Sequence, residues 1–196
     1  MLKRESIFHS TFNIQHFSHS SLCMKIRNHT ALKEWSSVIA ALARGEQILL
    51  IRKGGIADSN FGLEATSFYL FPTNFHEGGT SPAETVPITH WCEAVHTWQI
   101  RDLVTLYRLE PLVMFDRATL EQRYRFRSDQ AVNVIAVRTF ELPRPIHVRM
   151  DEQYAGCRSW VSLDEEIDTE GSRPVLSDTE LQARIQAVDA LLAATV

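Results

Sequence analysis

The chain has few cysteines, a small net charge and no long apolar run, and each shortage excludes a class of protein. Its 196 residues include three widely spaced cysteines, Cys23, Cys92 and Cys157, which do not form the pattern of a disulfide framework. The net charge of −4 gives no argument from bulk charge for nucleic-acid binding. No apolar run approaches the roughly 18 residues of a membrane-spanning helix, and the N-terminus lacks the apolar core of a secretory signal. We therefore expect a cytoplasmic protein with no membrane partner.

The length and composition indicate one globular domain with additions at both ends. Hydrophobic residues make up 44% of the chain and charged residues 22%, which is ordinary for a globular protein. Residues 1–28 are rich in Ser, His and Asn and predict a disordered tail. Because Met24 precedes the ordered pattern, residues 1–23 could also be an extension from an upstream start codon. We expect a core domain over residues 29–168, followed by a linker and an amphipathic helix over 169–196.

Hydrophobic periodicity predicts an α+β fold with a mixed or mainly antiparallel sheet, because the predicted strands mostly follow one another along the chain. Leu32, Trp35, Ile39 and Leu42 recur at helical spacing and predict a packing helix over residues 31–44. Residues 103–109 fit a strand or a helix, and residues 117–126 predict a short helix. The segment 74–87, with two glycines and two prolines, predicts a long loop. Strands are predicted at residues 47–51, 67–71, 93–100, 131–142, 146–150 and 159–163.

The last predicted element is a helix that begins near residue 178. Ser177 and Glu180 have the spacing of a capping box. Leu181, Ile185 and Val188 then form one apolar stripe, which Leu192 continues. That stripe must be buried, either on this domain or in a homodimer formed through the C-terminal helix.

Arg52, Lys53, Gly54 and Gly55 follow a buried strand and form the most suggestive pattern in the chain. Two glycines allow backbone N–H groups to converge on an anion, and the two cations add positive charge. The spacing is not that of a nucleotide-binding phosphate loop, which requires G-x-x-x-x-G-K-[ST]. The alternative is a Gly-Gly turn with its charges in water.

Four segments together resemble a known family. They are the runs ALKEW, LLIRKGGI, FPT with the nearby His76, and YAGCRSW, at residues 31–35, 49–56, 71–76 and 154–160. In this order they are similar to the family catalogued as domain of unknown function 1802, over about residues 29–165. The resemblance implies no assigned activity and no catalytic residues. It implies prokaryotic relatives, some with a restriction-endonuclease-type domain, and hence a role near restriction-modification or DNA handling. This chain has no room for a separate nuclease domain.

Three candidate residues would suit an enzyme. Cys157 precedes Arg158, a cation that could lower the pKa of its thiol and make it a nucleophile. His76 and Glu77 are the candidates for acid/base catalysis. The alternative for Cys157 is a buried cysteine beside Trp160 in the core. The sequence leaves open whether the protein is an enzyme.

Neither a metal nor a cofactor is expected. His90, Cys92 and His96 do not have the spacing of a standard zinc site. The acidic residues Asp58 and Glu64 lack the lysine that follows in restriction-type nucleases, where the pattern is D…E-x-K. A solvated loop is the simpler interpretation of these charges.

Arg123, Arg125 and Arg127 form the densest basic stretch, interleaved with Tyr124 and Phe126. Arginines with intervening aromatic side chains suit contacts to phosphate and bases. The alternative is the wet face of a helix, paired with nearby acidic residues.

These patterns support three hypotheses. The first is a non-catalytic module that binds an anionic ligand such as nucleic acid through Arg52, Lys53 and Arg158, with the arginines of residues 123–127. The second is an enzyme acting on a phosphorylated or nucleotide-like substrate. The third is a structural partner of another protein, which docks through the C-terminal helix.

Overall fold

A computed structural model describes residues 29–53, 65–73, 84–126, 129–156, 158–164 and 166–194. Within them lies a single mixed sheet with helices, which confirms the predicted α+β class. The predicted tail over residues 1–28 lies outside the described residues.

The elements follow one another along the chain with bounds that differ from the predicted ones in a few places. The strands are β1 Thr30–Trp35, β2 Leu49–Arg52, β3 Ser67–Thr73, β4 Thr85–Ile100, β5 Val132–Arg149, β6 Trp160–Ser162 and β7 Arg173–Pro174. The α-helices are α1 Ser36–Ala43, α2 Leu103–Tyr107, α3 Arg117–Arg125 and α4 Asp178–Ala193. Two short 3₁₀ helices are η1 Glu110–Leu112 and η2 Glu152–Tyr154.

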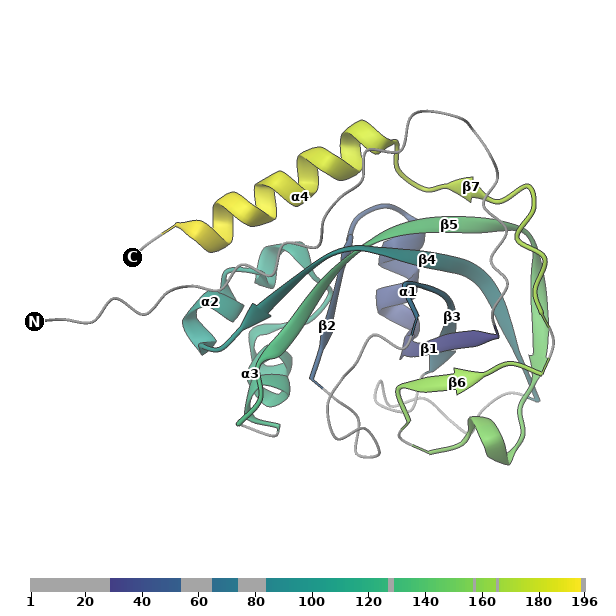
Figure 1. The fold of residues 1–196 in the computed structure, drawn as a ribbon. Helices are drawn as coiled ribbons and strands as arrows, with labels where there is room; N and C mark the ends of the chain where they lie inside the picture. Colours follow the sequence, from purple (N-terminus) through teal and green to yellow (C-terminus); the bar gives the residue numbers. More distant parts are fainter. Residues whose placement is uncertain are drawn as a thin grey trace, which may run out of the picture.

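The strands pair in the order β2-β5-β4-β3-β1-β6, and β7 pairs with β5 outside this path. β1 and β3 are parallel, whereas the other pairs are antiparallel. Figure 1 shows β4 and β5 as long curved strands that arch over β1, β3 and β6. The sheet is therefore strongly curled, which brings strands together that are far apart in the pairing order.

Residues 31–35 form a strand, so the prediction of one helix over 31–44 is wrong in its first part. Ala31 and Leu32 are both fully buried but belong to different core clusters. Consecutive side chains point to opposite faces in a strand, which makes this arrangement possible. β1 pairs with β3 on one side and with β6 on the other, and α1 begins directly after it at Ser36. The helical spacing of the apolar residues arose because a buried strand runs straight into an amphipathic helix.

Both faces of the sheet are covered. One face packs on α1 and α4, and the other lies under the chain between η2 and β7. Tyr69 donates from its hydroxyl to the Ile167 carbonyl at 2.9 Å, and the Trp91 indole N–H donates to the Ser172 hydroxyl at 3.0 Å. Ile167 is buried with the second core cluster, so the predicted acidic linker is in part a cover for the sheet.

Two other predicted boundaries need correction. β4 begins at Thr85, inside the segment predicted as a loop over 74–87. β5 continues from Val132 to Arg149, where two strands separated by a bend were predicted. The prolines of that bend lie where the ladder with β4 shifts register, between Glu141 and Ile146. Prolines are tolerated at such irregularities because a missing N–H costs no ladder bond there. Residues 103–109, left open between strand and helix, contain α2.

The C-terminal helix α4 has the predicted capping box. The Glu180 N–H donates to the Ser177 hydroxyl, and the Glu180 carboxylate accepts from the Ser177 N–H at 3.0 Å. Its apolar stripe, Leu181, Ile185 and Val188, is buried in the first core cluster of this same chain. A homodimer through this helix stays a prediction, and it would have to use a different face of α4.

Candidate anion-binding site

Arg52 at the end of β2 is paired with a carboxylate inside the molecule. One terminal nitrogen of Arg52 lies 3.1 Å from Oε2 of Glu34, and the side chains are 10% and 0% exposed. Glu34 also accepts from the N–H of Trp35 at 2.8 Å through its other oxygen. β1 and β2 are not neighbours in the pairing order, so this ion pair spans the curled sheet. Arg52 at the strand end is therefore neutralised by an internal carboxylate.

Lys53, the next residue, is also buried. Its ammonium donates to the Tyr124 carbonyl and lies 4.9 Å from the centroid of the Tyr124 ring. Burial lowers the pKa of Lys53, an effect that the negative charge of Asp129 partly offsets. The ammonium is thus held against α3, and its environment disfavours its charge.

Arg123 reaches the same place from α3. It donates to the Ile51 carbonyl of β2 at 2.8 Å. Its guanidinium lies 4.1 Å from the Phe115 ring centroid and 5.1 Å from that of Trp35. Burial lowers the pKa of Arg123 to about 10; the charge of Glu34 opposes this shift and that of Arg52 adds to it. Arg123 is therefore coupled electrostatically to the Arg52–Glu34 pair.

We call Glu34, Arg52, Lys53 and Arg123 the strand-end cluster. It contains three cations and one carboxylate, and cations remain in excess when nearby Asp129 is included. A charge in a partly dehydrated site is stabilised by a charge of the opposite sign far more than it would be in water. Together with Asp129, these side chains are three basic and two acidic groups.

Arg158 lies two residues before β6, the strand that pairs with β1. Leu32 of β1 pairs with Trp160, and the pairing continues because the Lys33 N–H donates to the Ser159 carbonyl at 2.8 Å. Arg158 directly precedes Ser159 in this segment and lies outside β6. Arg158 is exposed to water, whereas Arg52 and Lys53 are buried.

The basic stretch of residues 123–127 is divided between two environments. Arg123 joins the strand-end cluster, whereas Arg125 is exposed and contacts Glu121 on the same helix at 2.5 Å. The remaining predicted residues, Gly54, Gly55, His76, Glu77, Arg127 and Cys157, lie outside the described residues. The binding and catalytic roles assigned to all these residues stay predictions.

Other candidate chemistry is weaker in the described part of the chain. The Cys92 thiol is buried 3.5 Å from the Thr139 hydroxyl, and burial raises its pKa to about 12, so it is protonated. No group of three or more His, Cys, Asp or Glu side chains that could hold a metal occurs among the described residues. None of the described helices has the length and apolar character needed to cross a membrane.

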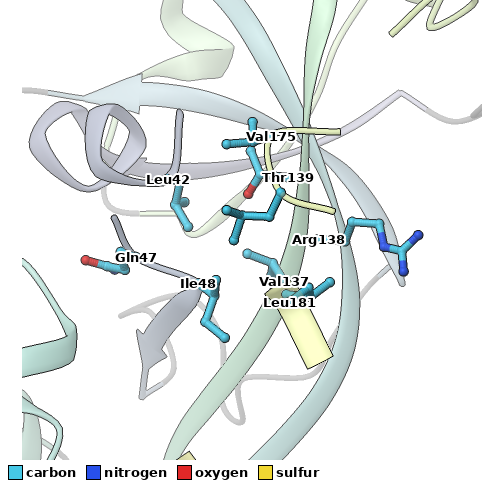
Figure 2. A pocket seen from close by; sticks show the side chains of 9 residues that line it. Leu42, Gln47, Ile48, Val137, Arg138, Thr139, Val175 and Leu181 are labelled. Atoms are coloured by element: carbon cyan, nitrogen blue, oxygen red, sulfur yellow. The ribbon is translucent and has the colours of Figure 1, made fainter. Parts of the chain in front are cut away.

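A small apolar hollow lies between the turn after α1, β5 and the start of α4. Its empty volume is about 220 Å³, a figure that includes open solvent at its mouth. Figure 2 shows the guanidinium of Arg138 pointing away from the other side chains that line it. Arg138 instead contacts Asp178 at 2.9 Å. The hollow offers few polar groups to orient a ligand.

Glu34, the carboxylate that pairs with Arg52 and interacts with the charge of Arg123, was not singled out from the sequence. In a helix over 31–44, Glu34 would lie on a wet face. In a strand, it shares a face with Leu32, which is buried. A buried carboxylate requires a cationic partner, so the correct assignment of residues 31–35 would have indicated a buried ion pair.

The fold and this site define the class of protein as an α+β domain with a curled mixed sheet. A buried ion pair connects β1 and β2, two strands that are not neighbours in this sheet. The chain belongs to the family described as domain of unknown function (DUF1802), whose model matches residues 31–79 and 77–187. The match extends into α4, beyond the range of about 29–165 over which the resemblance was expected. No curated protein matches the chain at a significant level.

Among solved structures, the chain is similar to the ASCH protein of Zymomonas mobilis. The identity is 14% and the TM-score 0.45, with 80% of this chain and 93% of that chain covered. A tyrosine-to-phenylalanine mutant of that protein gives 16% identity and a TM-score of 0.47, over 71% and 93% of the two chains. A serine-to-alanine mutant gives 14% and 0.44, over 84% and 99%.

Proposed function

We propose that this protein is a non-catalytic module that binds an anionic ligand, nucleic acid, at the strand-end cluster and Arg158. The observation that carries the proposal is that Arg52 and Arg123 both interact with the charge of Glu34, while Lys53, the residue after Arg52, bonds to the backbone carbonyl of Tyr124, the residue after Arg123. Each of these cations also contacts an internal oxygen or ring. They therefore hold the positive potential in place without having to reorganise when a ligand arrives.

The exposed Arg158 has a different part in the proposal. A guanidinium forms two parallel hydrogen bonds with a phosphate, which suits it to direct contact. The buried cations would act on the bound phosphate through their charge, and Arg158 would touch it. Gly54 and Gly55 keep their predicted role of allowing close backbone approach.

The number of cations limits the kind of nucleic acid that fits. Four cations can neutralise only a few phosphates, whereas a long duplex footprint uses about 6–10 phosphate contacts. We therefore expect recognition of a short stretch of strand, with a logarithmic salt slope no steeper than about 3. A function in DNA handling at a cytoplasmic location would agree with such binding.

Fluorescence anisotropy with single- and double-stranded DNA and RNA tests the proposal across about 50 to 200 mM salt. The unmodified protein should bind at low salt and lose affinity as salt rises. Arg158→Ala should weaken binding and flatten the slope by about one. Arg173→Ala is the matched control, because Arg173 is also exposed but pairs with Glu141 at 3.3 Å. Absence of binding at the lowest salt, or equal loss in both variants, would refute the proposal.

A further inference from the structure

We propose that Lys33 is the positioning residue of this anion site, and the inference rests on the proposed function. Lys33 lies on β1, between the buried Leu32 and Glu34. It would act through Arg158, by fixing the backbone that carries the Arg158 guanidinium toward the ligand.

Lys33 holds the chain on both sides of Arg158. Before Arg158, its ammonium donates to the carbonyls of Tyr154 and Gly156, at 2.5 Å and 2.9 Å. After Arg158, the backbone N–H of Lys33 donates to the Ser159 carbonyl at 2.8 Å. One residue of β1 thus bonds to three backbone groups of the segment that bears the exposed arginine.

The turn at residues 154–156 needs this support because only one of its side chains is anchored. Tyr154 is buried and stacks on Phe71, with ring centroids 5.2 Å apart. Gly156 has a φ of +78°, and a Cβ placed there would meet no atom within 4 Å. The turn is therefore open on its Gly156 side, and the Lys33 ammonium bonds two of its carbonyls to β1.

Removing the ammonium would leave the Tyr154 and Gly156 carbonyls without this donor. The segment would then sample several positions, and ordering it on binding would reduce the affinity. Lys33→Met keeps most of the side-chain stem, so the change isolates the ammonium. Lys33→Arg restores donors for both carbonyls and serves as the rescue variant.

The test is a double-mutant cycle on nucleic-acid affinity with Lys33→Met and Arg158→Ala. Each single variant should weaken binding by roughly threefold to tenfold at low salt, the scale of one phosphate contact. The double variant should bind no more weakly than Arg158→Ala alone, because Lys33 acts through Arg158. Lys33→Arg should recover most of the loss. A purely structural role would not make the effect of Lys33 depend on the presence of Arg158.

Gly156→Ala disturbs the same turn without changing charge and provides a second readout if Lys33→Met does not fold. A φ of +78° is unfavourable for alanine. The variant should weaken binding when Arg158 is present and have no effect in the Arg158→Ala background. Normal affinity of Lys33→Met or Gly156→Ala, or losses that multiply with that of Arg158→Ala, would overturn the role of Lys33. Failure of the unmodified protein to bind would instead overturn the proposed function.

Discussion

The two faces of α3 carry arginines that lie two residues apart in the sequence but in opposite environments. On the inner face, Arg123 is packed against Phe115 and Trp35 and bonds to the backbone of β2. On the outer face, Arg125 is 71% exposed and bonds to Glu121 one turn earlier. The sequence pattern is the same for both residues, and what differs is whether water reaches the charge.

This difference shows why the density of charge in a sequence is a poor guide to its energetic effect. An exposed ion pair replaces favourable contacts with water by the contact between its two charges, so the net gain in free energy of unfolding is small. A buried cation has lost its hydration, so removal of its partner leaves a charge with no compensation. We expect stability to respond to mutations on the inner face of α3 and in the strand-end cluster, and hardly at all on the outer face.

The largest effect is expected where both charges are buried. Arg52→Met leaves the fully buried Glu34 carboxylate without its cationic partner. Breaking a buried ion pair by removing one member typically costs about 3–5 kcal/mol. We expect a loss of this size in the free energy of unfolding, measured by urea denaturation.

A second variant separates loss of the pair from loss of packing. Glu34→Gln together with Arg52→Met removes both charges but keeps an oxygen that can accept from the Trp35 N–H. Since neither member of the pair is left behind, the double variant should recover part of the stability lost by Arg52→Met, and the part not recovered includes the loss of the Glu34 charge near Arg123. If the double variant is as unstable as the single one, packing rather than charge explains the loss.

The next effect concerns Arg123. Arg123→Met removes a hydrogen bond to the Ile51 carbonyl and the contacts with two aromatic rings. A hydrogen bond from a charged donor and a shielded cation–π contact together suggest a loss of about 2 kcal/mol. Urea denaturation with Arg125→Met as the matched control measures it. Equal stability of the two variants would remove the distinction between the faces of α3.

Sequence patterns predicted the elements that depend on local signals. The C-terminal helix followed from Ser177 and Glu180, and the α3 helix and the buried strands β2 and β6 were found near their observed bounds. The assignment of residues 31–35 failed because a strand buried on both faces has no alternating pattern. Its neighbours β3 and β6 come later in the chain, so no local signal could indicate the pairing.

Arg52, Lys53 and Arg123 were singled out from the sequence as cations of interest, whereas Glu34 was not, and a binding role for the three cations stays a prediction. Their internal partners were not foreseen, because the contact between β1 and β2 depends on the curl of the whole sheet. The ammonium of Lys33 was overlooked for the same reason, since its partners lie more than 120 residues away.

His90 on β4 is intermediate between the buried Arg123 and the exposed Arg125. Its titration allows the effect of partial burial to be tested through the pH dependence of stability. It is half-buried, and its Nδ1 lies 2.8 Å from the Thr89 hydroxyl. Burial lowers the pKa of His90, and the charge of Glu141 opposes this shift. As the pH falls below the unfolded value of about 6.5, the unfolded chain binds the proton first. The contribution of His90 to the free energy of unfolding is therefore complete above that pH and is lost as the pH falls toward the folded pKa.

His90→Gln removes this titration and should flatten the dependence of stability on pH just below about 6.5. The effect should be smaller than that of Arg123→Met, because the histidine is only half-buried. Urea denaturation of both proteins at several pH values provides the measurement. Glu93 has its pKa raised by burial and contributes in the opposite sense, but it is unchanged in both proteins. An identical pH dependence with and without His90 would contradict the prediction.

The smallest effect is expected for Arg125→Ala on the outer face of α3. The hydrogen bond from Arg125 is the largest of the influences that lower the pKa of Glu121, followed by that from the Tyr107 hydroxyl. Removing Arg125 should therefore raise the pKa of Glu121 in an NMR titration. The free energy of unfolding should nevertheless stay within error, because water replaces the lost contact. The Arg125–Glu121 pair should thus change a pKa without a measurable effect on the free energy of unfolding, whereas loss of Arg52 from the Arg52–Glu34 pair should lower that free energy strongly. A clear, salt-sensitive destabilisation by Arg125→Ala would show that exposure alone does not separate the two faces of α3.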